Sequence, residues 1–283
     1  MDITTVTSFR RAYERADLQL APGEVVLAGG TWLMSEPQPT TTGFVDLMTL
    51  GWPSLEITPT GLRIAATCTI AELVAWAEGR GDVAVPAEWT AASVFPEAAN
   101  ALLASFKIWN TATVGGNICR SYAAGAITTL AVALDGEAEI WMPGGGERRM
   151  PVAELITGNG TNSLAPGEVL RAVELPAAAL RSTTVLRKIA LAELGRSGAV
   201  VTGRIDDDGS SVFTVTAAVL RPVVLGYAGI PDAATLAAAV ADAPGYYTDP
   251  LGAADWRRGV SVVLAERIRG ELAGVQVDAE GRS

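Results

Sequence analysis

The chain has 283 residues, of which 49% are hydrophobic and 18% charged, a composition typical of globular rather than disordered proteins. It contains no histidine, which excludes Ser-His-Asp and Cys-His catalysis and histidine-ligated metals. Its two cysteines, Cys68 and Cys119, are too few to hold an iron–sulfur cluster or a four-cysteine zinc site within this chain. The net charge of −10 argues against nucleic acid as a general partner.

The sequence also favours a cytoplasmic protein without a membrane span. The first residues are polar, and no basic segment followed by an apolar one indicates a signal peptide. The longest nearly apolar run, 123–134, is shorter than the roughly 18–20 residues that a membrane helix needs. We therefore expect a cytoplasmic protein with reduced thiols.

The first third of the chain predicts one helix, two strands, a hairpin and a capped helix. Apolar residues at 9, 12, 13 and 16 have the spacing of an amphipathic helix, which Pro22-Gly23 ends. Strands follow at 25–28 and 44–47. Residues 55–64 predict a β-hairpin, and Thr69 with Glu72 forms a capping box for a helix that runs to about residue 78.

The middle of the chain predicts a helix at 98–107 and a glycine-rich irregular segment at 111–119. A helix that ends at 130–134 precedes two further strands, at 138–142 and 170–175. Residues 176–183 have the composition of a linker.

The last hundred residues predict strands at 184–190, 199–205 and 211–219, followed by two helices. The last helix is expected to place its large apolar residues on one face: Trp256, Val260, Val263, Leu264, Ile268 and Leu272. The pattern as a whole predicts an α+β fold with three parts, at 1–54, 55–177 and 184–280.

Two glycine-rich segments are the strongest functional signals. In the first, a strand at 25–28 runs into Gly29, Gly30 and Thr31; the second, 110–117, combines hydroxyl groups, a glycine pair and Asn117. Glycines let backbone N–H groups approach an anion, so two such loops can bind the two phosphates of a dinucleotide. Each loop alone is most often a plain turn, and the chain has neither a G-x-G-x-x-G nor a G-x-x-x-x-G-K-[ST] motif.

Taken together, the segments Ala-Gly-Gly-Thr (28–31) and Thr-Val-Gly-Gly-Asn (113–117) resemble the FAD pyrophosphate loops of the medium subunit of molybdenum hydroxylases, the carbon monoxide dehydrogenase and xanthine dehydrogenase family. Shorter resemblances follow in order at 44–47, 62–69, 108–110, 168–170 and 220–222. The resemblance implies a two-part, PCMH-type FAD-binding region followed by a C-terminal domain of the carbon monoxide dehydrogenase flavoprotein type.

The same resemblance implies that FAD lies between the first two parts of the chain. It assigns the pyrophosphate to residues of the two loops, namely Leu27, Ala28, Gly29, Gly30, Thr31, Trp32, Leu33, Thr113, Gly115, Gly116 and Asn117. Leu170 is expected near the isoalloxazine, and Lys188 near its polar edge, where a cation stabilises the anion of reduced flavin. No side chain is expected to act as acid, base or nucleophile, and no metal ligand is predicted.

Several positions depart from the family pattern. Ala123, Ala126 and Thr129 stand where the family has Pro, a cofactor-binding Asp and Pro. Loss of such a carboxylate costs about 1–3 kcal/mol of binding free energy. Trp109 replaces a frequent Arg, and Arg196 stands where acidic residues are common.

The function implied is that of the FAD subunit of a molybdenum hydroxylase. A molybdopterin-binding large subunit would oxidise the substrate, and a small subunit with two [2Fe–2S] clusters would pass the electrons to FAD. The external acceptor would be NAD, a quinone or oxygen. Two alternatives stay open: a flavin-free structural subunit on the same scaffold, and a stand-alone flavoprotein, for which no substrate base can be identified. Trp32 either stacks on the cofactor or packs in the protein, and Cys119 is either redox-sensitive or inert.

Overall fold

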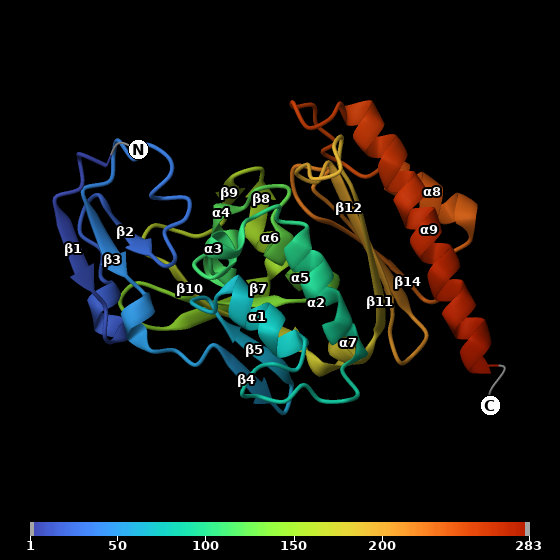
Figure 1. Cartoon of the computed structure of the whole chain (residues 1–283), viewed down its shortest axis with the longest axis horizontal. Helices are drawn as coiled ribbons and strands as arrows, with labels where there is room; N and C mark the ends of the chain where they lie inside the picture. The colour runs from blue at the N-terminus through green and yellow to red at the C-terminus, as the bar shows by residue number, and fades with distance from the viewer. Residues whose placement is uncertain (1–2, 281–283) are drawn as a thin grey trace.

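The computed structural model describes residues 3–280, with side chains as far as residue 274. Sheets and helices alternate along the long axis of the molecule (Figure 1). A three-stranded sheet lies at one end, a five-stranded sheet with most of the short helices lies in the middle, and a four-stranded sheet covered by two helices lies at the other end. Among these residues, none of the helices combines the length and the apolar character needed to cross a membrane.

The first sheet is parallel, with β3 at its centre. Its strands are β1 (Ser8–Arg11), β2 (Glu24–Leu27) and β3 (Gly43–Asp46), in the order β1-β3-β2. Short 3-10 turns follow β1 and β3, at Arg15–Leu18 and Met48–Leu50. The strands predicted at 25–28 and 44–47 are confirmed.

The helix predicted at the N-terminus is wrong. Residues 8–11 form β1 instead, because backbone pairing with β3 stabilises an extended chain more than the amphipathic pattern stabilises an isolated helix. The residues of the predicted apolar face are not buried together. Ala12 is buried, but Phe9 and Tyr13 are 56% and 66% exposed.

The second sheet is antiparallel and packs against the largest hydrophobic core among the described residues. Its strand order is β4-β5-β10-β6-β7, and a small β8–β9 hairpin follows β7. The strands are β4 (Leu55–Thr58), β5 (Gly61–Ala65), β6 (Glu137–Trp141), β7 (Glu147–Pro151), β8 (Ile156–Gly158), β9 (Thr161–Asn162) and β10 (Val169–Pro176). The predicted hairpin and the strands predicted at 138–142 and 170–175 are confirmed.

Short helices cover this sheet. They are α1 (Ile70–Ala77), α2 (Val94–Asn100), which follows a 3-10 turn at Thr90–Ser93, α3 (Phe106–Trp109), α4 (Val114–Arg120), α5 (Ala126–Ala133) and α6 (Val152–Leu155). The predicted capping box opens α1: Thr69 Oγ1 accepts a hydrogen bond from the N–H of Glu72, whose carboxylate accepts one from the N–H of Thr69.

Two predictions in this region are wrong. The single helix expected at 98–107 is two helices, because α2 ends at Asn100 and the chain turns through Leu103, whose φ is +34°. The segment 111–119 is not irregular, since residues 114–120 form α4. Thr113 caps this helix, and tertiary packing offsets the low helix propensity of its two glycines.

The third sheet is an antiparallel meander with the order β11-β12-β13-β14. Its strands are β11 (Thr183–Ile189), β12 (Ala199–Ile205), β13 (Ser211–Thr216) and β14 (Val223–Tyr227), preceded by α7 (Ala177–Arg181) in the predicted linker and followed by α8 (Ala233–Ala241) and α9 (Ala254–Glu280). Leu264, Ile268 and Leu272 of α9 are buried as expected. Val263 was placed on the same face wrongly, because it is 50% exposed.

The third sheet is joined to the middle of the molecule through α5. The Thr129 and Thr216 hydroxyl groups lie 2.8 Å apart in a buried hydrogen bond, and the N–H of Ala217 donates to the carbonyl of Ala123. Arg204, only 3% exposed, donates to the carbonyl of Ala133 and pairs with Asp135 and Asp206. The contact between these two parts is therefore polar as well as apolar, and the domain boundaries at 54, 177 and 184 stay a prediction.

We expect Arg204→Met to lower the free energy of unfolding by about 2–3 kcal/mol, because it removes a buried cation and leaves its partners without a donor. Arg187→Met is the matched control on the neighbouring strand, since it removes an exposed pair with Glu271 and should cost less than about 1 kcal/mol. Urea denaturation measures both. Equal losses for the two variants would contradict a structural role for Arg204.

Candidate functional site

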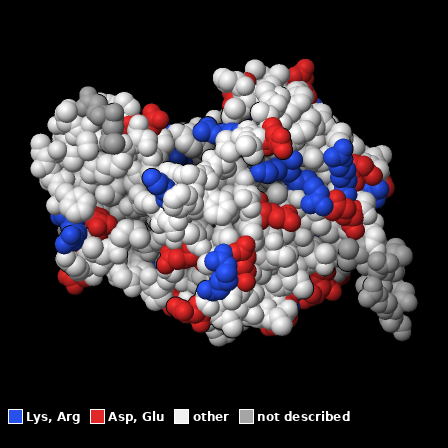
Figure 2. Space-filling view, viewed as in Figure 1, with Lys and Arg blue, Asp and Glu red and all other residues white. Residues whose placement is uncertain are grey.

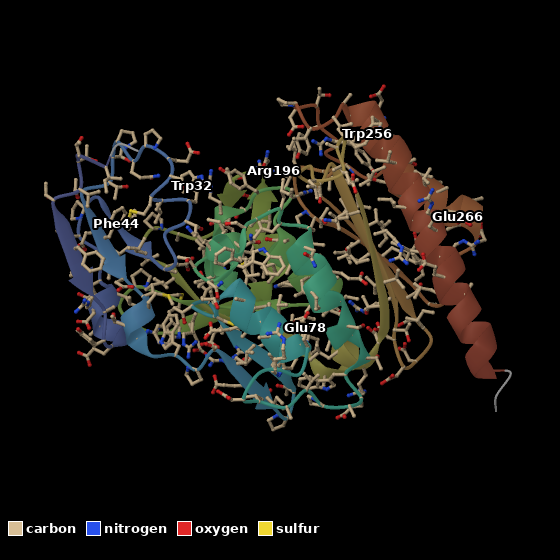
Figure 3. All side chains as sticks on the ribbon, in the orientation of Figure 1. Trp32, Phe44, Glu78, Arg196, Trp256 and Glu266 are labelled. Carbon is tan, nitrogen blue, oxygen red and sulfur yellow. The ribbon has the colours of Figure 1, made fainter. Side chains whose placement is uncertain are left out.

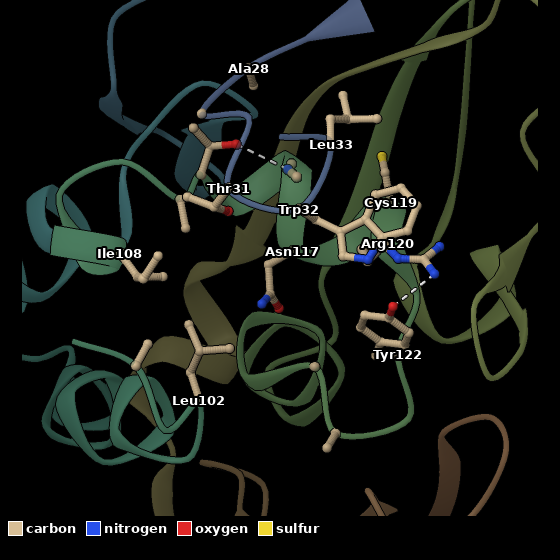
Figure 4. Close-up of a pocket in the computed structure, with 18 of the residues that line it drawn as sticks. Ala28, Thr31, Trp32, Leu33, Leu102, Ile108, Asn117, Cys119, Arg120 and Tyr122 are labelled. Carbon is tan, nitrogen blue, oxygen red and sulfur yellow. Dashed lines mark hydrogen bonds between the residues drawn. The ribbon is translucent and has the colours of Figure 1, made fainter. Parts of the chain in front are cut away.

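A cavity of about 750 Å³ lies where the first sheet, α4 and the loops of the C-terminal region meet. Its size is within the range of ordinary small-molecule sites. Four stretches of chain form most of its lining: 28–33 after β2, 101–108 from the end of α2 into α3, 112–125 around α4, and 164–170 before and into β10. The rest of the lining comes from Val26, Leu47, Ala66, Asn159, Arg196, Tyr247, Asp249 and Leu251. Figure 4 shows its N-terminal and central walls.

The loop 28–33 presents backbone donors. None of the N–H groups of residues 28–33 has a hydrogen-bond partner within the described chain, whereas the carbonyls of Gly30 and Trp32 accept from residues 34–36. Gly30 has a φ of +67°, a conformation that glycine adopts without strain. A row of unpaired, half-buried N–H groups at a cavity is a binding site for water or an anion.

The second glycine segment is built differently. Its N–H groups are used internally: Gly115 donates to Ala66, Gly116 to Thr113 Oγ1 at 3.1 Å, and Asn117 to the carbonyl of Thr113. A Cβ atom on Gly115 would lie 2.5 Å from that of Ala66, so this glycine permits close packing of α4. The two segments therefore differ, because in the second the N–H groups of Gly115, Gly116 and Asn117 are paired within the protein.

Asn117 connects the second segment to the next helix. Its Oδ1 accepts a hydrogen bond of 3.0 Å from the N–H of Ile127 in the first turn of α5. Its Nδ2 has no partner among the described residues, and the side chain lines the cavity (Figure 4). The amide is thus oriented by the protein, with its donor end available to a ligand.

The two segments contact each other directly at Gly29. A Cβ atom there would lie 1.7 Å from the carbonyl oxygen of Thr111. Any larger residue would push the first loop away from the chain that leads into α4. The cavity depends on this glycine for its shape.

An aromatic–cation stack forms part of the wall. The Arg120 guanidinium lies 3.8 Å from the ring centroid of Trp32 and 4.2 Å from that of Tyr122, and its Nη2 donates to the Tyr122 hydroxyl (Figure 4). Trp32 thus packs on a protein side chain as well as lining the cavity. Sequence reasoning missed Arg120 and Tyr122, because neither belongs to a recognisable motif.

The structure brings together most of the predicted cofactor residues. Ala28, Gly29, Gly30, Thr31, Trp32, Leu33, Thr113, Gly115, Gly116, Asn117 and Leu170 line the cavity. Leu27 does not line it and is buried at the end of β2. Lys188 also lies outside it, with its Nζ donating to the carbonyl of Asn100 at 2.8 Å. Arg196 lines the cavity instead, and Figure 3 places it and Trp32 along the same edge of the molecule.

Three of the positions that depart from the family pattern, those that follow the second glycine segment, have structural roles here. Ala126 begins α5 and is fully buried, without lining the cavity. Ala123 does line it, and its N–H donates to the Asn159 side chain. Thr129 makes the buried hydrogen bond to Thr216. None of these side chains replaces the missing carboxylate.

Comparison with known proteins identifies the class. Residues 3–178 match the model of the FAD-binding domain in molybdopterin dehydrogenase, so the chain belongs to this family of oxidoreductase domains. The predicted family and its cofactor, FAD, are thereby confirmed. No curated protein sequence matches the chain.

Solved structures extend the similarity over the C-terminal region. Quinoline 2-oxidoreductase from Pseudomonas putida 86 aligns with a TM-score of 0.76 and 18% identity over 94% of this chain and 96% of the other. Reconstituted CO dehydrogenase from Oligotropha carboxidovorans aligns with a TM-score of 0.77 and 19% identity over 92% and 95%. CO dehydrogenase from Hydrogenophaga pseudoflava aligns with a TM-score of 0.75 and 15% identity over 93% and 95%. The predicted α+β fold is confirmed.

The residues present fit FAD. A pyrophosphate needs donors without competing partners, and the loop 28–33 supplies unpaired N–H groups beside an oriented amide, Asn117.

We therefore expect Gly29→Ala to lower the FAD content of the purified protein at least about tenfold, because the methyl group separates the loop from Thr111. The measurement is the flavin-to-protein absorbance ratio.

Gly259→Ala, in α9, is the control for this variant. The space around the missing methyl group is open, so the change should leave the FAD content unaltered and stabilise the helix by up to about 1 kcal/mol. Full FAD content in Gly29→Ala would show that the loop contact is not needed.

Cys119 lines the cavity, and burial raises the pKa of its thiol to about 12; burial also raises the pKa of Cys68. Because the thiolate is the reactive form, alkylation of Cys119 by iodoacetamide at pH 8 should be about a thousandfold slower in the native protein than in urea. Mass spectrometry of the tryptic peptide measures this rate. Rapid labelling of the native protein would favour the redox-sensitive alternative.

Proposed function

We propose that this chain is the FAD-binding subunit of a molybdenum hydroxylase complex. In this proposal it accepts electrons from the [2Fe–2S] clusters of a small partner subunit and passes them to an external acceptor. The observation that carries the proposal is the cavity in which residues 28–33 present unpaired N–H groups next to Asn117, in a chain of the FAD-binding family.

The residues of the chain would bind and orient the cofactor. The N–H groups of 28–33 and the Asn117 Nδ2 would bind the pyrophosphate, and the buried Leu170 would pack near the isoalloxazine. FAD supplies the redox chemistry, since it accepts electrons singly and releases them in pairs. Of Arg196 and Lys188, only Arg196 lines the cavity, so Arg196 rather than Lys188 would supply the cation expected beside the flavin.

The partners follow from the same proposal. A large subunit would hold molybdopterin and carry out substrate oxidation, and the small subunit would hold the clusters. The acceptor would be NAD, a quinone or oxygen. One of the similar structures, the CO dehydrogenase from Hydrogenophaga pseudoflava, is described as a form that lacks the Mo-pyranopterin moiety of the molybdenum cofactor. That enzyme therefore has a molybdenum cofactor of the kind proposed for the large subunit.

A cytoplasmic location is part of the proposal and agrees with two unpaired cysteines.

The test is the visible absorption spectrum of the purified protein, followed by identification of the cofactor released on denaturation. We expect about one FAD per chain, reduced when substrate is added to the assembled complex. A colourless assembly that takes up no added FAD would contradict the proposal. It would favour the flavin-free structural subunit, which the absence of a carboxylate at Ala126 motivates.

A further inference from the structure

The acidic groups of the cavity are already neutralised by cations behind its wall. Glu168 accepts two hydrogen bonds from Arg148, at 2.8 and 2.7 Å, and the pairing lowers the pKa of its carboxyl group. Asp249 pairs with Arg257, which is fully buried. Neither carboxylate is left to neutralise a cation inside the cavity.

The cations of the cavity have no such partners. Neither Arg120 nor Arg196 forms an ion pair with a carboxylate within the described part of the chain. The cavity therefore carries unpaired positive charge, although the whole chain has a net charge of −10. Figure 2 shows small groups of basic side chains at the hollow between the two ends of the molecule, while others lie beside acidic side chains on the C-terminal part. This charge distribution favours an anionic ligand.

Arg120 is held between aromatic side chains, and two of its three nitrogens have no hydrogen-bond partner among the described residues. The guanidinium carbon lies over the rings of Trp32 and Tyr122, at 3.8 and 4.2 Å from their centroids, and the Tyr122 hydroxyl accepts only from Nη2. Nε is buried without a partner, and Nη1 has no hydrogen bond either. Stacking thus restricts the side chain while it leaves N–H donors unused.

The position of Arg120 relative to the first loop indicates which part of a ligand it meets. Its stacking partner Trp32 belongs to the loop 28–33, whose N–H groups are unpaired. Arg196, in contrast, is exposed and belongs to the β11–β12 connection. The stack on Trp32 thus connects Arg120 to the loop that carries the unpaired N–H groups.

We infer that Arg120 is the cation that binds the pyrophosphate of the flavin, held in place by Trp32 and Tyr122. The inference rests on the proposed function, because it takes FAD as the ligand. Arg120 would provide charge-assisted hydrogen bonds to the phosphate oxygens, which are acceptors only.

The test is titration of the flavin-free full chain with FAD and with riboflavin, which lacks phosphate, followed by flavin fluorescence at low and high salt. Arg120→Met keeps the length of the side chain and removes its charge. We expect its Kd for FAD to rise about 10- to 100-fold, with a weaker dependence on salt, and its Kd for riboflavin to change less than about twofold. Arg120→Lys should recover part of the FAD affinity.

Arg267→Met is the matched control, because Arg267 is exposed on α9 and forms no ion pair among the described residues. It should bind both flavins like the unmodified chain, and thermal unfolding checks that every variant is folded. An Arg120→Met variant that binds FAD as the unmodified chain does, or that loses FAD and riboflavin equally, overturns the inference. If the unmodified chain binds no FAD, the proposed function itself fails.

Discussion

The close approach of Gly29 to the Thr111 carbonyl is the constraint on which the site depends. It brings a loop from the parallel N-terminal sheet against the segment that leads into α4, although the two are far apart in sequence. Gly115 allows a second close contact, between α4 and Ala66 at the end of the central sheet. With both contacts in place, the first loop forms one wall of the cavity and α4 forms the next.

The two glycine segments use their backbone donors differently. In the second, the N–H groups of Gly115, Gly116 and Asn117 are paired within the protein, and the Asn117 side chain lines the cavity. In the first, the N–H groups are left unpaired and stand beside a stacked arginine. Both glycine pairs thus permit close packing, at Gly29 and at Gly115, but the surrounding backbone uses the N–H groups of the second pair and leaves those of the first unpaired.

Sequence reasoning was correct where a local signal and the tertiary environment agree. The Thr69–Glu72 capping box begins a helix, and β4, β5, β6 and β10 of the second sheet lie where strands were predicted. It was wrong where distant contacts decide. Residues 8–11 pair with β3 instead of forming a helix, and residues 114–120 are helical despite two glycines because they pack on Ala66.

The sequence by itself determined the family, the cofactor class and the two loops that line the cavity, because these depend on short glycine motifs whose order along the chain is specific. Only the tertiary structure decided which donors and charges face the cavity. Lys188 turns to the end of α2, while Arg120 and Arg196 line the cavity without carboxylate partners among the described residues. The reason is physical: a charge acts on a ligand according to its distance and its pairing in space, and neither is encoded in a local motif.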